Sequence, residues 1–79
     1  MKKYIISIDA GTTSNRAILF DLKGNPIFSS QKEFTQFFPK SGWVEHNPEE
    51  IWNTTKKVLK NVISKSKKLK GKILTVGIT

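Results

Sequence analysis

The 79-residue sequence contains no cysteine, a single arginine and no long apolar segment. The absence of cysteine excludes disulfides, thiolate metal sites and cysteine nucleophiles, and fits a reducing compartment. No apolar run approaches the roughly 18 residues that a membrane-spanning helix needs. The first apolar segment meets Asp9 before the core of a signal peptide could form. We therefore expect a cytoplasmic chain with no membrane span.

Acidic residues are also scarce, since six of them stand against fourteen basic residues and the formal net charge is +8. Residues 1–55 hold six of each sign, so the excess comes from eight lysines in residues 56–72: Lys56, Lys57, Lys60, Lys65, Lys67, Lys68, Lys70 and Lys72. Such a cluster can attract a nucleic acid or an anionic membrane. No arginine or aromatic residue interleaves the run to read or stack on bases. We predict a solvated helix face and no specific nucleic-acid site.

The remaining composition, 37% apolar and 25% charged, is typical of a globular domain. The length excludes a multidomain enzyme and allows one compact unit or a piece of a larger one. Short apolar segments separated by turn residues predict three strands, at residues 4–9, 16–21 and 27–34. Two tight connections make them an antiparallel meander. Residues 35–46 are interpreted as a loop that tucks aromatic rings against the sheet, among them Phe37, Phe38 and Trp43.

A helix is predicted to begin after Asn47, an N-cap residue followed by Pro48 at the first helical position and by Glu50, which completes a capping box. Its apolar residues share one face: Ile51, Trp52, Val58, Leu59, Val62 and Ile63. We expect Gly71 to take a left-handed conformation at the helix exit, and residues 73–78 to form another strand. A helix between two strands predicts a crossover, so the last strand lies parallel to a strand of the meander. The fold class is therefore α/β, with the order β-β-β-α-β and a mixed sheet.

The turn between the first two strands, residues 9–14, combines a carboxylate, a glycine and three hydroxyls. Such a turn can direct backbone N–H groups at a phosphate, and Gly11 lets the phosphate approach the backbone closely. A carboxylate at the end of a strand suits hydrated Mg²⁺, which takes only one or two protein oxygens. The alternative is an ordinary polar hairpin turn. The motif is not a P-loop, because no Gly-Lys-Ser/Thr follows at the required spacing.

Two separated segments carry a family resemblance. Residues 8–16, Ile-Asp-Ala-Gly-Thr-Thr-Ser-Asn-Arg, resemble the first phosphate loop of the FGGY carbohydrate kinases. Residues 39–52 resemble the segment by which the glycerol kinases of that family are recognised, and residues 77–79 are similar to the strand that follows. The resemblance covers the whole chain. It implies a single partial domain, residues 1–79, at the start of an actin-like, ribonuclease-H-like ATPase domain.

The resemblance also implies roles for individual residues. The carboxylate of Asp9 helps to hold Mg²⁺, and the loop residues Gly11, Thr12, Thr13 and Ser14 receive the phosphates of ATP. Arg16 adds a fixed positive charge at the phosphates. From the residues alone, the favoured interpretation of Arg16 is a surface ion pair with a nearby carboxylate. Ala10 and Asn15 depart from the residues usual in glycerol kinases, but each keeps a small or polar side chain in the turn.

Other parts of the family's machinery are not found in these 79 residues. They include the Asn-Gln-Arg-Glu run that holds glycerol, the catalytic base and the second phosphate loop. His46 and Asp21 are interpreted as structural or exposed residues, and Trp43 and Trp52 as core residues, so none of them is a candidate base or sugar platform. We expect the chain alone to bind ATP or ADP weakly and to leave glycerol unphosphorylated. The alternative is a non-catalytic module that binds phosphate weakly or pairs with a partner through an exposed strand.

Overall fold

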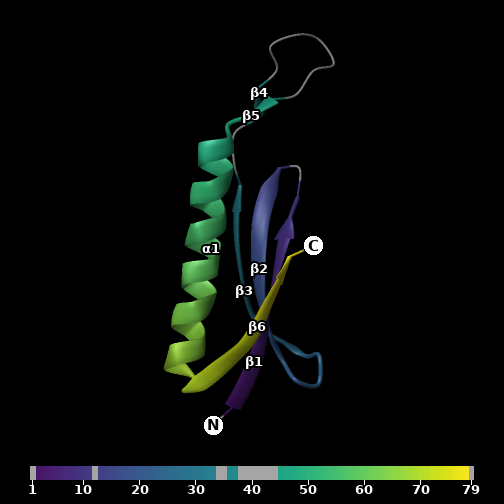
Figure 1. Cartoon of the computed structure of the whole chain (residues 1–79), viewed down its shortest axis with the longest axis vertical. Helices are drawn as coiled ribbons and strands as arrows, with labels where there is room; N and C mark the ends of the chain where they lie inside the picture. The colour runs from purple at the N-terminus through teal and green to yellow at the C-terminus, as the bar shows by residue number, and fades with distance from the viewer. Residues whose placement is uncertain (1, 12, 34–35, 38–44, 79) are drawn as a thin grey trace.

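A computed structural model describes residues 2–11, 13–33, 36–37 and 45–78 of the chain. One helix lies against a sheet of four strands, and two short strands form a separate pair (Figure 1). The elements in chain order are β1 (Lys2–Ala10), β2 (Ser14–Asp21), β3 (Pro26–Glu33), β4 (Gln36–Phe37), β5 (Glu45–His46), α1 (Pro48–Lys68) and β6 (Gly71–Ile78).

The main sheet has the strand order β3-β2-β1-β6. Strand β2 pairs antiparallel with both β1 and β3, whereas β6 pairs parallel with β1 after the crossover through α1. The predicted meander, crossover and mixed sheet are confirmed. The segment interpreted as a loop contains the antiparallel pair β4 and β5. The prediction that its aromatic rings tuck against the sheet concerns side chains outside the described part of the structure.

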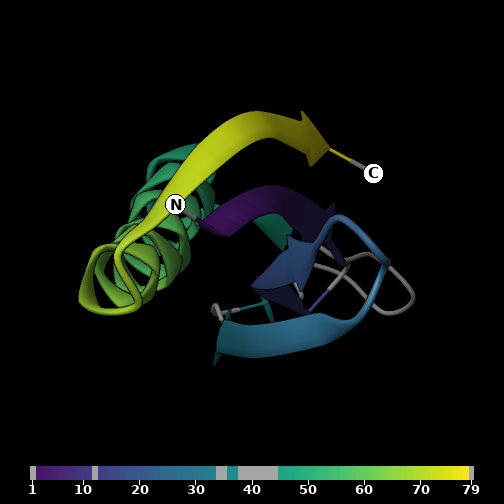
Figure 2. The same ribbon diagram turned by 90° about the horizontal axis from the view of Figure 1, so that it is seen from below.

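The core lies between α1 and one face of the sheet. Alternate residues of β1 and β2 meet Val58 and Val62 of the helix, and the buried apolar side chains are Tyr4, Ile6, Ile8, Ala17, Leu19, Val58 and Val62. Figure 2 shows that α1 covers this face and leaves the opposite face without a helix. The nearly continuous apolar run of residues 4–9 predicts a strand that is buried on both faces. That expectation is wrong for the described chain, because the alternate residues Ile5, Ser7 and Asp9 are only half-buried.

Both ends of α1 are stabilised by local contacts. The Asn47 side chain accepts hydrogen bonds from the N–H groups of Glu49, at 2.9 Å, and Glu50, at 3.4 Å, which confirms the predicted N-cap. At the other end, Lys70 has the left-handed φ of 55°, so the assignment of that conformation to Gly71 is wrong. Gly71 is needed for space instead, since a Cβ there would collide with the Tyr4 ring.

The buried face of α1 is more polar than its sequence pattern predicts. The buried residues of the helix recur every four positions and are Thr54, Val58, Val62 and Ser66. Trp52 was predicted on the apolar face, but its side chain is 60% exposed and lies under the ammonium group of Lys56, 5.4 Å from the ring centroid. The interpretation of Trp52 as a core residue is therefore wrong. Among the described residues, no helix is both long enough and apolar enough to cross a membrane.

Candidate functional site

The turn between β1 and β2 is closed by a short backbone hydrogen bond. The Gly11 N–H donates to the Ser14 carbonyl at 2.9 Å. A Cβ at position 11 would lie 3.0 Å from that same carbonyl oxygen, which explains why glycine fits this tight closure. Thr12 lies outside the described residues, and Thr13 is exposed. The described part of the turn is thus tightly closed and presents Thr13 to solvent.

Asp9 and Arg16 are direct neighbours across the β1–β2 pair. A guanidinium nitrogen of Arg16 lies 3.5 Å from a carboxylate oxygen of Asp9, and the two side chains are 46% and 49% exposed. They stand on the face of the sheet opposite α1, because the alternate residues of β1 contact the helix. The surface ion pair considered for Arg16 from the sequence is therefore present. An exposed pair of this kind contributes only about 0–1 kcal/mol to stability, so both groups can change partners at little cost.

Ser14 stands at the start of β2 and is held from the neighbouring strand. Its hydroxyl accepts a hydrogen bond from the side-chain amide of Gln31 at 2.8 Å. Gln31 lies opposite Arg16 in the β2–β3 pair, so it borders the same face as the ion pair. Sequence reasoning did not identify Gln31. Once the register of β3 is known, its position beside Arg16 follows.

Asn15 is the unexpected residue of this region. It is fully buried under α1, and its side-chain amide donates to the hydroxyls of Thr54, at 2.9 Å, and Thr55, at 2.8 Å, and to the Ile51 carbonyl, at 3.1 Å. Both threonine hydroxyls donate in turn to that carbonyl. These contacts fix the strand that follows the turn to the first turns of the helix. The signal in the sequence that could have identified this role is a polar residue at a position of β2 where the alternating pattern places core residues.

The oxygen of the Asn15 side chain is buried and has no hydrogen-bond partner among the described residues. A buried acceptor without a partner costs roughly 1–3 kcal/mol. The contacts of the side-chain NH₂ group therefore hold Asn15 in place although burial of its unpaired oxygen is unfavourable. The hydrogen-bonded network positions the turn but leaves no group of Asn15 exposed for a ligand.

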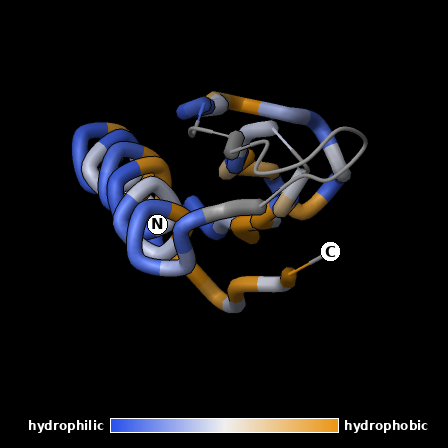
Figure 3. The backbone as a smooth tube through the Cα atoms, turned by 90° about the horizontal axis from the view of Figure 1, so that it is seen from above, coloured by the Kyte–Doolittle hydropathy of each residue, from blue (hydrophilic) through white to orange (hydrophobic). Residues whose placement is uncertain are grey.

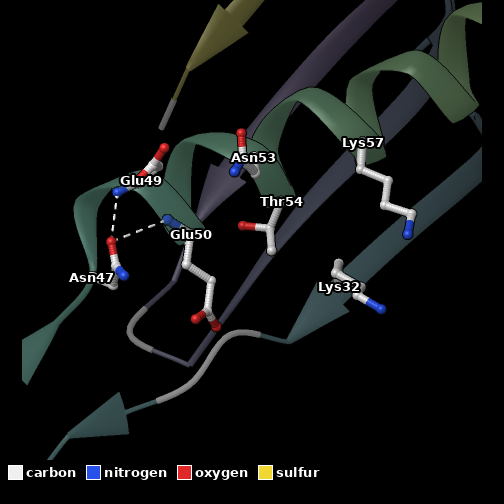
Figure 4. A pocket seen from close by; sticks show the side chains of 7 residues that line it. All are labelled: Lys32, Asn47, Glu49, Glu50, Asn53, Thr54 and Lys57. Carbon is white, nitrogen blue, oxygen red and sulfur yellow. Dashed lines mark hydrogen bonds between the residues drawn. The ribbon is translucent and has the colours of Figure 1, made fainter.

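Acidic side chains gather near the turn, at the start of α1 and the end of β3. A surface pocket of about 360 Å³ lies there between the helix and β3 (Figure 4), lined by Lys32, Asn47, Glu49, Glu50, Asn53, Thr54 and Lys57. None of the described turn residues lines it. The described residues contain no group of three or more acidic or histidine side chains that could hold a metal ion. Asp9 is thus a carboxylate outside any such group, and hydrated Mg²⁺ needs only one or two protein oxygens.

Of the residues that the sequence analysis rejected as a catalytic base or sugar platform, Asp21 is described by the structure, whereas the side chains of His46 and Trp43 are not. The Asp21 carboxylate accepts hydrogen bonds from the N–H groups of Lys23 and Asn25, both at 2.9 Å, which confirms its role in the β2–β3 turn. These bonds, that of Asn25 above all, lower the pKa of Asp21.

Comparison with known proteins identifies the family of the chain. Residues 4–79 match the model of the N-terminal domain of the FGGY family of carbohydrate kinases. The glycerol kinase of Alkaliphilus metalliredigens is 56% identical over 79 residues, and that of Enterococcus faecalis is 56% identical over 78 residues. These matches cover 100% and 99% of this chain but 16% of each relative. The chain therefore spans about a sixth of the length of the curated relatives it matches.

Solved structures give the same result for the fold. Glycerol kinase from Plasmodium falciparum, solved with ADP, superposes with a TM-score of 0.85 at 31% identity, over 99% of this chain and 16% of that one. Gluconate kinase from Lactobacillus acidophilus superposes with a TM-score of 0.87 at 28% identity, over 100% of this chain and 15% of that one. The main sheet with its crossover helix is thus that of sugar kinases with the actin-like ATPase fold, as the family resemblance implied.

Proposed function

The chain belongs to the FGGY family of carbohydrate kinases, and from this premise we propose that it carries the first phosphate-binding element of a glycerol kinase. Such an enzyme transfers the γ-phosphoryl group of ATP to glycerol. The observation that carries the proposal is the pairing of Asp9 with Arg16 beside the closed turn, on the face of the sheet that α1 leaves open. The Asp9 carboxylate, proposed for Mg²⁺, and the Arg16 guanidinium, proposed for phosphate, lie 3.5 Å apart there.

Each proposed ligand contributes a distinct group. Asp9 holds hydrated Mg²⁺ through its carboxylate. The backbone and hydroxyls of Gly11, Thr12, Thr13 and Ser14 receive the phosphates. Arg16 neutralises phosphate charge, which is the main task of a protein in phosphoryl transfer. When bound, Mg²⁺ would supply positive charge that neutralises the phosphates.

The ion pair implies an exchange of partners on binding. In the described structure, Asp9 and Arg16 neutralise each other. With nucleotide bound, the Asp9 carboxylate would hold the cation and the Arg16 guanidinium would neutralise the phosphates, so the two side chains would no longer pair with each other. The exchange costs little because both side chains are about half exposed. The glutamates at the start of α1 oppose an unaccompanied anion, so ATP is expected to bind as its magnesium complex.

A second candidate function is a non-catalytic module that associates through β6. This strand is an edge of the sheet, and three of its apolar side chains are exposed: Leu74 is 48%, Val76 44% and Ile78 76% exposed. Figure 3 shows β6 as mostly apolar, in contrast to the hydrophilic helix. Val76 and Ile78 pair with Ile6 and Ile8, so they continue the core face of the sheet beyond the area that α1 covers. After Lys72 the strand carries neither charge nor proline, and such an edge invites another strand.

Nucleotide titration tests the proposed phosphate site. With ¹⁵N-labelled chain, ATP and Mg²⁺ together should shift the amide signals of Gly11 and Thr13 with millimolar affinity, and ATP without Mg²⁺ should bind more weakly. Asp9→Asn should remove the effect of Mg²⁺, whereas Asp21→Asn, at the other end of the same strands, should leave it unchanged. Shifts confined to other regions, or equal in both variants, would leave only the module function. No glycerol 3-phosphate should form in either case.

A further inference from the structure

The positive charge of the chain gathers at the end of the molecule opposite the β1–β2 turn. Four segments meet there in Figure 1: the start of β1, the β2–β3 turn, the end of α1 and the start of β6. The register agrees, since Lys3 pairs with Lys72 and Tyr4 with Asp21. We call this surface the basic end and define it by its seven exposed lysines: Lys2, Lys3, Lys23, Lys67, Lys68, Lys70 and Lys72.

Almost no acidic charge balances these lysines. Among the described residues, Asp21 is the acidic side chain at the basic end, and its carboxylate is occupied by the N–H groups of the turn. The other described acidic side chains, Asp9, Glu33, Glu49 and Glu50, belong to the end of β1, the end of β3 and the start of α1. The basic end therefore carries a local excess of six positive charges, well away from the proposed phosphate site.

Exposed apolar side chains lie among these lysines. Leu22 is 57% and Ile27 41% exposed, and both line a surface groove of about 480 Å³ together with Lys2, Lys3 and Lys23. Tyr4 also borders the groove but is only 3% exposed, so no aromatic face is available for stacking on a base. Lysines surrounding exposed aliphatic groups are characteristic of surfaces that lie at a membrane interface.

We propose that the basic end docks on an anionic lipid surface, with the lysines near the headgroups and Leu22 at the boundary of the acyl chains. Clustered lysines each contribute about 1 kcal/mol at such a surface. Recognition of a nucleic acid is less well supported, because the exposed residues of this end include neither arginine nor an aromatic ring. Docking is independent of the proposed kinase chemistry. It leaves the β1–β2 turn facing away from the bilayer, open to nucleotide.

Vesicle sedimentation with the full 79-residue chain tests the proposal. The chain should bind vesicles of phosphatidylcholine with about a third phosphatidylserine, should not bind pure phosphatidylcholine, and should be released by salt. Replacing Lys2, Lys3 and Lys23 by Gln should lower partitioning roughly a hundredfold. The matched control replaces Lys32, Lys57 and Lys60 by Gln, which removes the same charge outside the basic end and should lower it less than about tenfold. Circular dichroism verifies that both variants fold.

Two further measurements test how the basic end contacts the vesicle: binding of the Leu22→Ser variant and binding to duplex DNA. Leu22→Ser should lower binding to the anionic vesicles roughly tenfold, because it removes the aliphatic group expected to enter the interface. An unchanged value would contradict docking through this turn. Equal losses in the two triple variants would show attraction by net charge alone and overturn the proposal. So would tighter binding to duplex DNA than to anionic vesicles at the same salt concentration.

Discussion

The two ends of the sheet differ in how their polar groups are used. At the turn end, Asp9 pairs with Arg16, Ser14 with Gln31, and Asn15 with three groups of the helix. At the basic end, the exposed lysines have almost no acidic partners in the described structure. Groups held by neighbours can present a defined geometry, as phosphate chemistry requires. A field of unpaired lysines is suited to a diffuse anionic surface, where charge density matters more than geometry.

The comparison also explains why the net charge of +8 is a poor guide to the phosphate site. A positively charged loop would be the simplest expectation for a nucleotide-binding chain. Here the described acidic residues other than Asp21 lie at the turn end, and the ATP binding proposed for that end relies on a cation and on Arg16. The lysines of the basic end lie at the other end of the sheet, away from the proposed phosphate site. The two ends should therefore respond differently to mutation, salt and pH.

The largest expected effect is at the basic end, where Gly71 packs on Tyr4. Gly71→Ala places a methyl group into the buried tyrosine ring, so the ring must leave its site and we expect a loss of about 3 kcal/mol in the free energy of unfolding. Gly77→Ala is the matched control in the same strand, since nothing lies within 4 Å of its added Cβ. Urea unfolding measures both. Equal changes for the two variants would show that the Tyr4 contact does not limit position 71.

A smaller effect is expected for the network that holds the turn end. Asn15→Ala removes the two N–H donors that three acceptors of α1 share, together with the buried oxygen that has no described partner, so we expect a loss of about 1–2 kcal/mol. Asn61→Ala removes one exposed bond, to the Ser30 hydroxyl at 3.0 Å, and should change stability by less than about 0.5 kcal/mol. Amide exchange at Gly11 should quicken in the first variant alone. Unchanged exchange there would mean that the network does not position the turn.

Asn15 also shows where sequence reasoning fails. Periodicity gave the strands, and Asn47 with Pro48 gave the start of the helix, because those signals depend on neighbouring residues. The partners of Asn15 lie 36 to 40 residues away, so no local pattern connects them. The same limit accounts for Gly71, whose partner Tyr4 is in another strand. The prediction for Trp52 was wrong for a different reason. It rested on helical spacing alone, and Trp52 lies one position away from the buried face of α1.

The candidate site was predictable in part. The short meander places Asp9 beside Arg16 wherever the turn between them is tight, so the ion pair could be anticipated from the sequence. Gln31 could not, because its position depends on the register of β3, which shifts between Leu19 and Phe20. The chemistry assigned to the turn came from the family resemblance. The charge run was visible in the sequence, but the fold was needed to bring Lys2, Lys3 and Lys23 to it.

Asp21 links stability at the basic end to pH. Hydrogen bonds from the N–H groups of Asn25 and Lys23 lower the pKa of Asp21 below its ordinary value of 3.8. A lowered folded-state pKa means that the carboxylate stabilises the fold above that ordinary value, and that this contribution is lost as the pH falls through the folded-state pKa. The melting temperature of the wild type should therefore exceed that of Asp21→Asn at neutral pH, and the difference should shrink below pH 3.8. A difference that is constant with pH would contradict this assignment.

The smallest expected effect on stability comes from exchanging the ion pair itself. Asp9→Arg combined with Arg16→Asp preserves a cross-strand pair of opposite charges at exposed positions, so the free energy of unfolding should change by less than about 0.5 kcal/mol. ATP and Mg²⁺ should nevertheless no longer bind, because the carboxylate and the cation have moved to the wrong strands for the turn between them. Titration and urea unfolding of the same variant separate the two roles. Retained nucleotide binding would reduce Asp9 and Arg16 to an ordinary surface pair, whereas its loss at unchanged stability would assign their geometry to phosphate binding.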